Sequence, residues 1–309
     1  MKNTKNAHIA GRIEELKKKH NAVIIAHNYQ IGEVQDVADF VGDSLELSQK
    51  AAQIESDIIV FCGVHFMAET AAILSPQKTV LLPEKDAGCP MADMITASDV
   101  REWKKRYPGR KVVCYVNTTA EVKAECDICC TSSNAVEVVE SLDGDEVLFA
   151  PDKNLAAYVA RHTDKKIIPW DGYCYVHNNI QVKDIEDKRR LHPEAEVWVH
   201  PECYPDVIDI ADKVFSTGKM VKEARETKKK QIVIGTEAGM IYRLKSENPG
   251  KEFFPVKDLA FCFNMKKIDL KKVLMSLEEL KYKVEIPPEI RKKALGSITK
   301  MVKINGEKK

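Results

Sequence analysis

The sequence predicts an α/β fold, with three pseudo-threefold-related αβα sandwich domains whose sheets are parallel and surround a central site. Three observations predict it. Apolar runs alternate with helical patterns, the apolar runs are continuous rather than alternating, and one order of landmarks recurs three times along the chain. Continuous apolar strands are typical of parallel sheets that helices cover on both faces. A recurrence with a fixed order of landmarks indicates a triplicated unit.

Each unit begins with an apolar run that ends at a polar triplet. The first residues of these triplets lie 88 and 85 residues apart, which is a suitable size for a small domain. The runs and their triplets are Val23–Ala26 with His27-Asn28-Tyr29, Val112–Cys114 with Tyr115-Val116-Asn117, and Val197–Val199 with His200-Pro201-Glu202.

Four further landmarks follow each triplet in the same order. A hydroxyl residue comes first, then a second apolar run, then a third run that ends at proline, and finally a cysteine. These landmarks are Ser44, Ile58–Cys62, Leu81-Leu82-Pro83 and Cys89 in the first unit; Ser132, Val147–Ala150, Ile167-Ile168-Pro169 and Cys174 in the second; and Ser216 with Thr217, Ile232–Gly235, Phe253-Phe254-Pro255 and Cys262 in the third.

The repeats divide the chain into four expected segments. We expect an N-terminal helix and the first αβα unit in residues 1–106, the second unit in 107–194, the third in 195–265, and a C-terminal helical segment in 266–309. Helical patterns cover residues 9–20, 44–53, 134–141 and 219–226, and Pro287-Pro288 interrupts the C-terminal segment.

Charge and composition exclude several classes of protein. The 309 residues carry 48 Lys and Arg against 47 Asp and Glu, and no aromatic residues interleave with the lysine clusters, so we expect no nucleic-acid partner. No apolar window is long enough for a membrane span or a signal peptide, which predicts a cytoplasmic protein with no membrane partner. In a reducing compartment the nine cysteines are expected to be free thiols or metal ligands.

The polar triplets follow the strands at the edge where parallel sheets bind ligands. The hydroxyls of Ser44, Ser132, Ser216 and Thr217 come just before helices, where free N–H groups and the helix dipole favour anions. For any one of these hydroxyls taken alone, simple capping of the helix is the favoured explanation. Three equivalent sites favour a central pocket for a small, multiply anionic ligand.

The three matching cysteines, Cys89, Cys174 and Cys262, are expected in loops around one centre. Three thiolates are soft ligands suited to iron–sulfur or zinc, and three protein ligands leave one coordination position open. A [4Fe-4S] cluster with one unligated iron fits this set best; a zinc site and buried inert thiols are the alternatives.

Six other cysteines stand outside this register. The motif Cys126-x-x-Cys129-Cys130 occurs in only one repeat, so it is either a redox or regulatory motif or a set of packed thiols. Cys62, Cys114 and Cys203 lie in or just after predicted strands and are expected to fill the core.

Taken together, these residues resemble the quinolinate synthase family. The resemblance rests on the three cysteines, the polar triplets, Ser132, Ser216-Thr217 and the stretch Trp170-Asp171-Gly172-Tyr173-Cys174, and it runs over essentially the whole chain. It implies three αβα domains around a [4Fe-4S] cluster held by Cys89, Cys174 and Cys262. It also implies condensation of iminoaspartate with dihydroxyacetone phosphate to quinolinate, phosphate and water, and transient contact with the enzyme that supplies iminoaspartate.

For that reaction we expect Glu202 to be the main general base, with Tyr29 and Tyr115 moving or orienting protons. The residues expected to hold substrate carboxylate and phosphate oxygens are His27, Ser44, Asn117, Ser132, His200, Ser216 and Thr217, with Tyr115 and Glu202 beside them. The open iron would act as a Lewis acid for dehydration.

Two other readings compete with this one. The radical enzymes of diphthamide synthesis and the reductase that forms isoprenoid diphosphates also resemble three-domain proteins with one cluster cysteine per domain, but neither resemblance carries the polar triplets. An iron–sulfur redox sensor that uses Cys126, Cys129 and Cys130 is the non-enzymatic alternative, and it leaves the same triplets unexplained.

Overall fold

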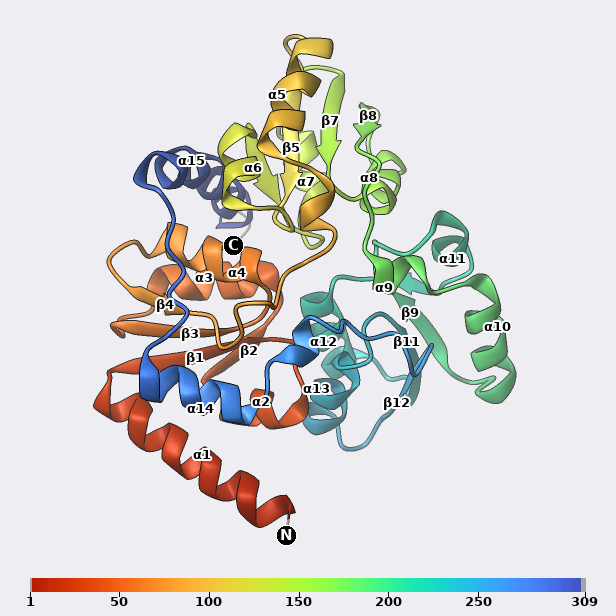
Figure 1. Ribbon diagram of the computed structural model, residues 1–309. Coiled ribbons are helices and arrows are strands. Elements are labelled where there is room, and N and C mark those ends of the chain that lie inside the picture. The colour runs from red at the N-terminus through yellow and green to blue at the C-terminus, as the bar shows by residue number, and fades with distance from the viewer. Residues whose placement is uncertain (1, 307–309) are drawn as a thin grey trace.

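The computed structural model describes residues 2–306, and three four-stranded parallel sheets organise this part of the chain (Figure 1). All three sheets have one topology, in which the first strand of each repeat lies between its second and third strands: β2-β1-β3-β4, β6-β5-β7-β8 and β10-β9-β11-β12. The predicted fold class of three similar α/β domains is therefore confirmed.

The first sheet begins after a long N-terminal helix, α1 (Lys2–Lys19). Its strands are β1 (Ala22–His27), β2 (Phe40–Gly42), β3 (Ile58–Cys62) and β4 (Thr79–Leu81). The connecting helices are α2 (Gly32–Val37), α3 (Ser44–Gln53), α4 (His65–Leu74) and α5 (Ala97–Arg106), with the short η1 (Ala92–Met94) after the first cysteine.

The second and third sheets repeat this plan. The second has β5 (Lys111–Tyr115), β6 (Ile128–Cys130), β7 (Glu146–Ala150) and β8 (Lys166–Pro169), with α6 (Ala120–Glu125), α7 (Ala135–Glu140), α8 (Lys153–Ala160), α9 (Tyr175–Asn178) and α10 (Val182–Leu191). The third has β9 (Glu196–Val199), β10 (Lys213–Val214), β11 (Gln231–Gly235) and β12 (Glu252–Pro255), with α11 (Pro205–Asp209), α12 (Thr217–Glu226), α13 (Met240–Glu247) and η2 (Met265–Lys267).

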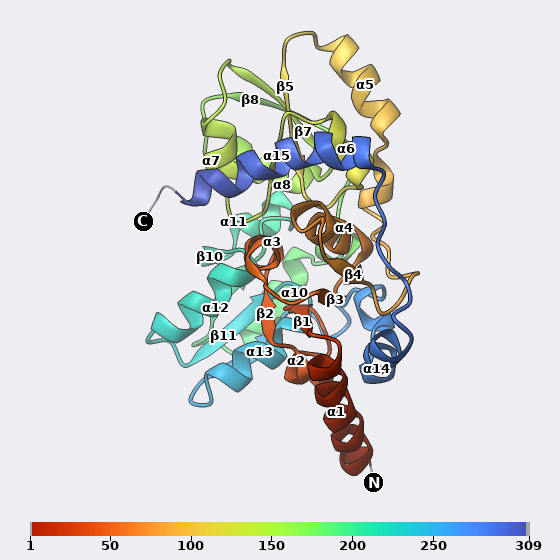
Figure 2. The same cartoon turned by 90° about the vertical axis from the view of Figure 1, so that its left-hand side faces the viewer.

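The C-terminal segment forms two helices that tie the domains together. Helix α14 (Leu270–Glu279) packs beside α1, and α15 (Pro288–Gly306) lies across α6 and β6 and also contacts α4 (Figure 2). Helix α14 ends at Glu279, and Pro288 is the first residue of α15, a position that suits proline because its missing N–H has no helical partner there. The predicted interruption at Pro287-Pro288 therefore falls at the start of the second helix.

A repeated aspartate contact shows the triplication at atomic detail. In each repeat one aspartate accepts a hydrogen bond from a backbone N–H of the central strand, 15 residues earlier, and donates its own N–H to the carbonyl of the same residue. The pairs are Asp39 with Ile24, Asp127 with Val112 and Asp212 with Val197. This contact fixes the edge strand of every sheet in one position.

The strands form the core, as their continuous apolar sequences predict. All five residues of β3 are buried, and so are the last four of β5 and of β7. Among residues 2–306, no helix combines the length and the apolar character that crossing a bilayer requires.

Candidate active site

The carboxyl ends of the three sheets face one cavity. Residues of all three repeats line it, as the position of ligand sites in parallel sheets predicts. Of the predicted site residues, the structure brings together Cys89, Cys174, Cys262, His27, Tyr29, Ser44, Tyr115, Asn117, Ser132, His200, Glu202 and Thr217. Ser216 lies just outside this lining, in an adjoining surface pocket.

Each repeat contributes one cysteine to the cavity. Burial raises the pKa of the Cys89 thiol to about 12, and the nearby Cys262 raises it further. Burial likewise raises the pKa of Cys174, and Glu202 and Cys89 add to this effect. Three thiols that face one cavity suit a metal centre, since a bound cation deprotonates the thiols that coordinate it. The donor set therefore fits an iron–sulfur cluster.

The other cysteines lie elsewhere. Cys126, Cys129 and Cys130 are buried around β6, and Cys129 Sγ lies 3.4 Å from Ser297 Oγ of α15. None of the three lines the cavity. Cys62, Cys114 and Cys203 are fully buried, which confirms that they fill the core.

The predicted hydroxyl sites lie at helix starts, but their roles differ. Ser216 caps α12 and accepts the N–H of Lys219 at 3.3 Å, so the capping interpretation holds for it. The cap of α3 is Asp43, which accepts two backbone N–H groups, and Ser44 is the first helical residue. The hydroxyl of Ser133 lies 2.8 Å from both Asp43 Oδ2 and Ser216 Oγ, and so joins the three repeats.

Two imidazoles of the triplets are neutral. Burial lowers the pKa of His27 and of His200 to about 3. The Nδ1 atom of each ring accepts a backbone N–H two residues later, from Tyr29 at 3.2 Å and from Glu202 at 3.4 Å. An Nδ1 that accepts leaves Nε2–H as the donor, so both rings can donate to a substrate oxygen.

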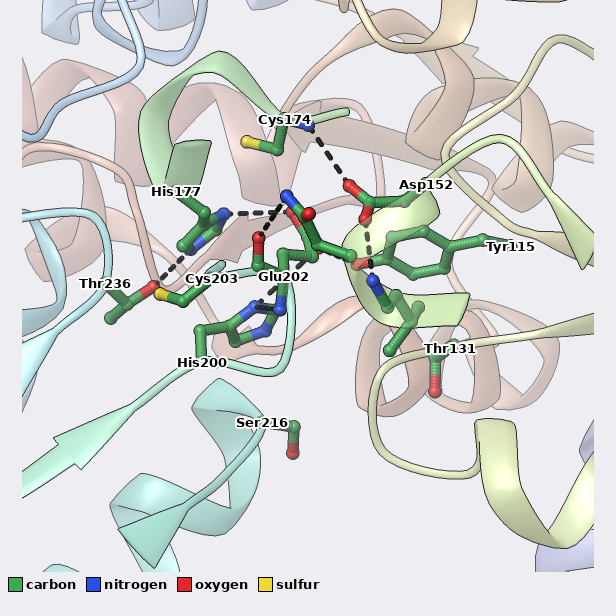
Figure 3. Close-up of polar contacts among 12 residues, drawn as sticks. Tyr115, Thr131, Asp152, Cys174, His177, His200, Glu202, Cys203, Ser216 and Thr236 are labelled. Atoms are coloured by element: carbon green, nitrogen blue, oxygen red, sulfur yellow. Dashed lines mark hydrogen bonds and ion pairs between the residues drawn. The ribbon is translucent and has the colours of Figure 1, made fainter. Parts of the chain in front are cut away.

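A chain of hydrogen bonds crosses the site (Figure 3). Tyr115 donates its hydroxyl to Glu202 Oε1, and His177 Nδ1 lies 2.9 Å from Glu202 Oε2. His177 Nε2 lies 2.7 Å from the hydroxyl of Thr236, which lies 2.6 Å from that of Tyr29. The chain thus connects residues of all three repeats.

The chain sets the protonation state of its members. Burial opposes the charge of the Glu202 carboxyl, but His177 beside it and the hydrogen bonds from His177 and Tyr115 outweigh burial and lower its pKa to about 2. Burial and the Glu202 charge raise the pKa of Tyr29 and of Tyr115 well above the ordinary value. At neutral pH the site therefore holds one ionised carboxylate between two neutral phenols.

His177 and Thr236 are site residues that the sequence reading missed. His177 follows Cys174 by three residues, in the four-residue helix α9, and its ring stacks on His200 with 4.5 Å between centroids. Thr236 directly follows β11, at a strand end where polar residues are expected. Asn28 of the first triplet donates to Thr217 Oγ1 at 2.9 Å, so it links the first and third repeats.

The charge of the cavity is unusual for an anion site. Among the described residues, no lysine or arginine lines it, whereas Asp43, Glu202 and Glu237 do. Lys266 and Arg243 lie behind the lining, where their charges help to lower the pKa of His27. Backbone N–H groups at helix starts and neutral imidazole donors add positive potential at the cavity surface.

Comparison with known proteins agrees with this geometry. Residues 11–303 match the family model described as quinolinate synthetase A protein. A quinolinate synthase of Dehalococcoides mccartyi strain 195 is 60% identical over 96% of this chain and 98% of its own length. One of Thermodesulfovibrio yellowstonii is 53% identical over 93% and 95%, and quinolinate synthase 2 of Methanosarcina acetivorans is 51% identical over 96% of both chains. The chain belongs to the quinolinate synthase family.

Proposed function

We propose that this protein is a quinolinate synthase that condenses iminoaspartate with dihydroxyacetone phosphate to quinolinate, phosphate and water. The observation that carries the proposal is one cavity that receives a cysteine from every repeat together with the Tyr115–Glu202–His177 hydrogen-bond chain. Family membership supports the same reaction, since the relatives carry this name over nearly their whole length.

Cys89, Cys174 and Cys262 are the residues that would hold a [4Fe-4S] cluster. Three ligands leave one iron open, and the bound cluster supplies Lewis-acid polarisation of a substrate oxygen. The cavity also offers the set of Cys174, His177 and Glu202, whose ligand atoms lie within 4.8 Å of one another. We assign His177 and Glu202 to proton transfer instead, because their mutual hydrogen bond occupies the atoms that a metal would need.

The hydrogen-bond chain from Tyr115 through Glu202 and His177 carries out proton transfer. Glu202 is ionised at neutral pH and accepts a proton from the substrate. His177 lies between Glu202 and Thr236 and relays protons between these two residues. Tyr29 and Tyr115 remain protonated and donate to oxygens that leave or gain charge during dehydration. This extends the role expected of Glu202, which acts with His177 rather than alone.

Substrate anions are held by neutral donors. His27 and His200 present Nε2–H groups, and the start of α12 presents Thr217. Asn117 Oδ1 is buried and has no hydrogen-bond partner among the described residues, so it can accept a substrate N–H or O–H. Ser44 and Ser132 complete the set on the sides of the first and second repeats.

We further propose a cytoplasmic location and transient contact with the enzyme that supplies iminoaspartate. A cluster with an open iron requires reduced thiols, which favours a reducing compartment. Iminoaspartate is an imine that water hydrolyses, so its source must lie close to the site that consumes it.

The deciding experiment is anaerobic purification, measurement of iron and sulfide, and assay of quinolinate from the two substrates. Quinolinate formed only by the cluster-loaded protein establishes the function. An intact cluster without quinolinate overturns it.

A further inference from the structure

The three cysteine loops share one backbone contact. In each repeat, one residue lies three positions after the end of the third strand. Its backbone N–H donates to the carbonyl of the residue two positions before the cysteine. The contacts run from His65 to Ala87 at 2.8 Å, from Lys153 to Gly172 at 2.8 Å and from Ala238 to Ala260 at 2.7 Å. All three cysteine loops are therefore anchored at the same place.

Two of the loops have a second anchor. Asp152, directly before Lys153, accepts the N–H of Cys174 through Oδ2 at 3.1 Å (Figure 3). Glu237, directly before Ala238, accepts the N–H of Cys262 through Oε1 at 3.0 Å. The equivalent residue of the first repeat is Val64, directly before His65, and an apolar side chain cannot accept the N–H of its cysteine.

Both carboxylates are fully buried and held on rigid elements. Asp152 Oδ1 caps α8 by accepting the N–H of Leu155 at 2.8 Å. Glu237 Oε2 accepts the N–H of Gly239 at 2.7 Å, and Glu237 Oε1 pairs with Lys266 at 2.8 Å. A side-chain oxygen fixed in this way restricts the backbone N–H that it accepts.

Capping alone does not explain Asp152. Serine, threonine and asparagine cap helices about as well as aspartate does, and burying a carboxyl group costs more free energy than burying a hydroxyl. The second oxygen is the feature that aspartate adds, and that oxygen accepts only the Cys174 N–H among the described side-chain contacts.

We infer that Asp152 and Glu237 are positioning residues that orient the backbone of Cys174 and Cys262 before a cluster binds, whereas among the described residues no side chain accepts the N–H of Cys89. The inference rests on the proposed function, since it takes the three cysteines to be cluster ligands. Hydrogen-bonded groups behind metal ligands commonly set the orientation of those ligands.

Amide hydrogen exchange of the cluster-free protein tests the anchors without any cluster. In the wild type, the Cys174 and Cys262 amides should exchange more slowly than the Cys89 amide. Asp152→Asn keeps one acceptor oxygen and the shape of the cap but loses the other oxygen, so exchange of the Cys174 amide alone should quicken. Asp269→Asn is the matched control, because Asp269 caps α14 away from the cavity. Unchanged exchange at Cys174 in Asp152→Asn overturns the inference.

The cluster-loaded protein supplies a second readout. Iron release to a chelator should quicken roughly tenfold or more in Asp152→Asn, as is typical when a group behind a metal ligand is lost. The electron paramagnetic resonance signal of the reduced cluster should also shift, whereas Asp269→Asn should match the wild type. Glu237→Gln provides the same test at Cys262 should Asp152→Asn fail to fold. If the protein shows the predicted exchange pattern but binds no cluster, the proposed function is refuted. The hydrogen bonds of Asp152 and Glu237 to the two cysteine amides are then still supported.

Discussion

His177 Nδ1 lies 2.9 Å from Glu202 Oε2, and the two residues come from the second and third repeats. Both side chains are buried, so the contact is shielded from water and fixes the carboxylate from one side. Tyr115 fixes it from the other side. A carboxylate held between an imidazole and a phenol has a defined position and a defined proton path, and a catalytic base needs both.

Replacement of Glu202 by glutamine should abolish most turnover while leaving the cluster in place. The amide cannot accept a proton, so we expect kcat to fall by about 10²–10⁴-fold, the usual contribution of a positioned acid or base. Iron and sulfide content should equal that of the wild type. Glu226→Gln, on the exposed end of α12, is the control and should keep full activity. Unchanged turnover in Glu202→Gln would refute the role of Glu202.

Thr236 tests the far end of the hydrogen-bond chain. Thr236→Val has nearly the same shape but breaks the contacts to His177 and Tyr29. Each lost hydrogen bond is worth about 1 kcal/mol, so kcat should fall roughly tenfold. Thr236→Ser keeps the hydroxyl and should restore most of the rate. Equal rates in the valine and serine variants would show that the chain carries no proton.

The sequence was sufficient for the fold and for most of the cavity, because both depend on patterns that repeat. The strand ends placed His27, Tyr115 and Glu202 correctly, since parallel strands deliver their following residues to one edge. A short helix follows the cavity cysteine in every repeat, and the positions that match His177 hold Ala92 and Met265. His177 was missed because no repeated residue type marks this position, and its contacts with Glu202 and Thr236 appear only in the fold.

The helix caps show a second limit of sequence reading. Asp43 and Ser44 are adjacent, and either can begin a helix. The alignment of hydroxyls favoured Ser44, whereas the structure gives the cap to Asp43, whose neighbour Glu46 completes a capping box. The recurring hydroxyl at this point of the repeat therefore predicts the place of the helix start but not which residue caps it.

Replacement of one cavity cysteine should prevent stable cluster assembly. Serine is a harder and more basic ligand than a thiolate, so Cys174→Ser should lose most of its iron and sulfide. Cys126→Ser, in a cysteine outside the cavity, should keep both. Iron and sulfide analysis with the absorption spectrum of anaerobic protein measures this. Stoichiometric iron in Cys174→Ser would remove Cys174 from the ligand set.

Acid should destabilise the fold in a window set by the buried imidazoles. The pKa of His200 falls from 6.5 in the unfolded chain to about 3 in the folded protein, and His27 behaves alike. Between these two pH values, the imidazoles are protonated in the unfolded chain but neutral in the folded protein. The free energy of unfolding therefore decreases as the pH falls. The slope is about 1.4 kcal/mol per pH unit for each imidazole. Below 4.5, Glu202, whose pKa is lowered to about 2, adds to the loss.

Urea unfolding of the cluster-free protein at a series of pH values measures this slope. His200→Gln removes one titrating group and should flatten the dependence below pH 6.5 by about one proton. Exposed His8, replaced in the same way, should leave the slope as it is. An unchanged slope in His200→Gln would mean that its imidazole is protonated in the folded protein.

Two glycines in the cysteine loops provide a matched test of packing. A Cβ added at Gly172 would lie 2.5 Å from the backbone oxygen of Pro151, whereas one added at Gly88 would meet nothing within 4 Å. Because a backbone oxygen cannot move aside as a side chain can, Gly172→Ala must displace the loop that carries Cys174. We expect it to lower the free energy of unfolding by about 1–3 kcal/mol and to reduce the cluster content. Gly88→Ala, one residue before Cys89, should change neither, since the added methyl group has open space there. Equal stability and equal iron in both variants would mean that the Cys174 loop is not held against Pro151.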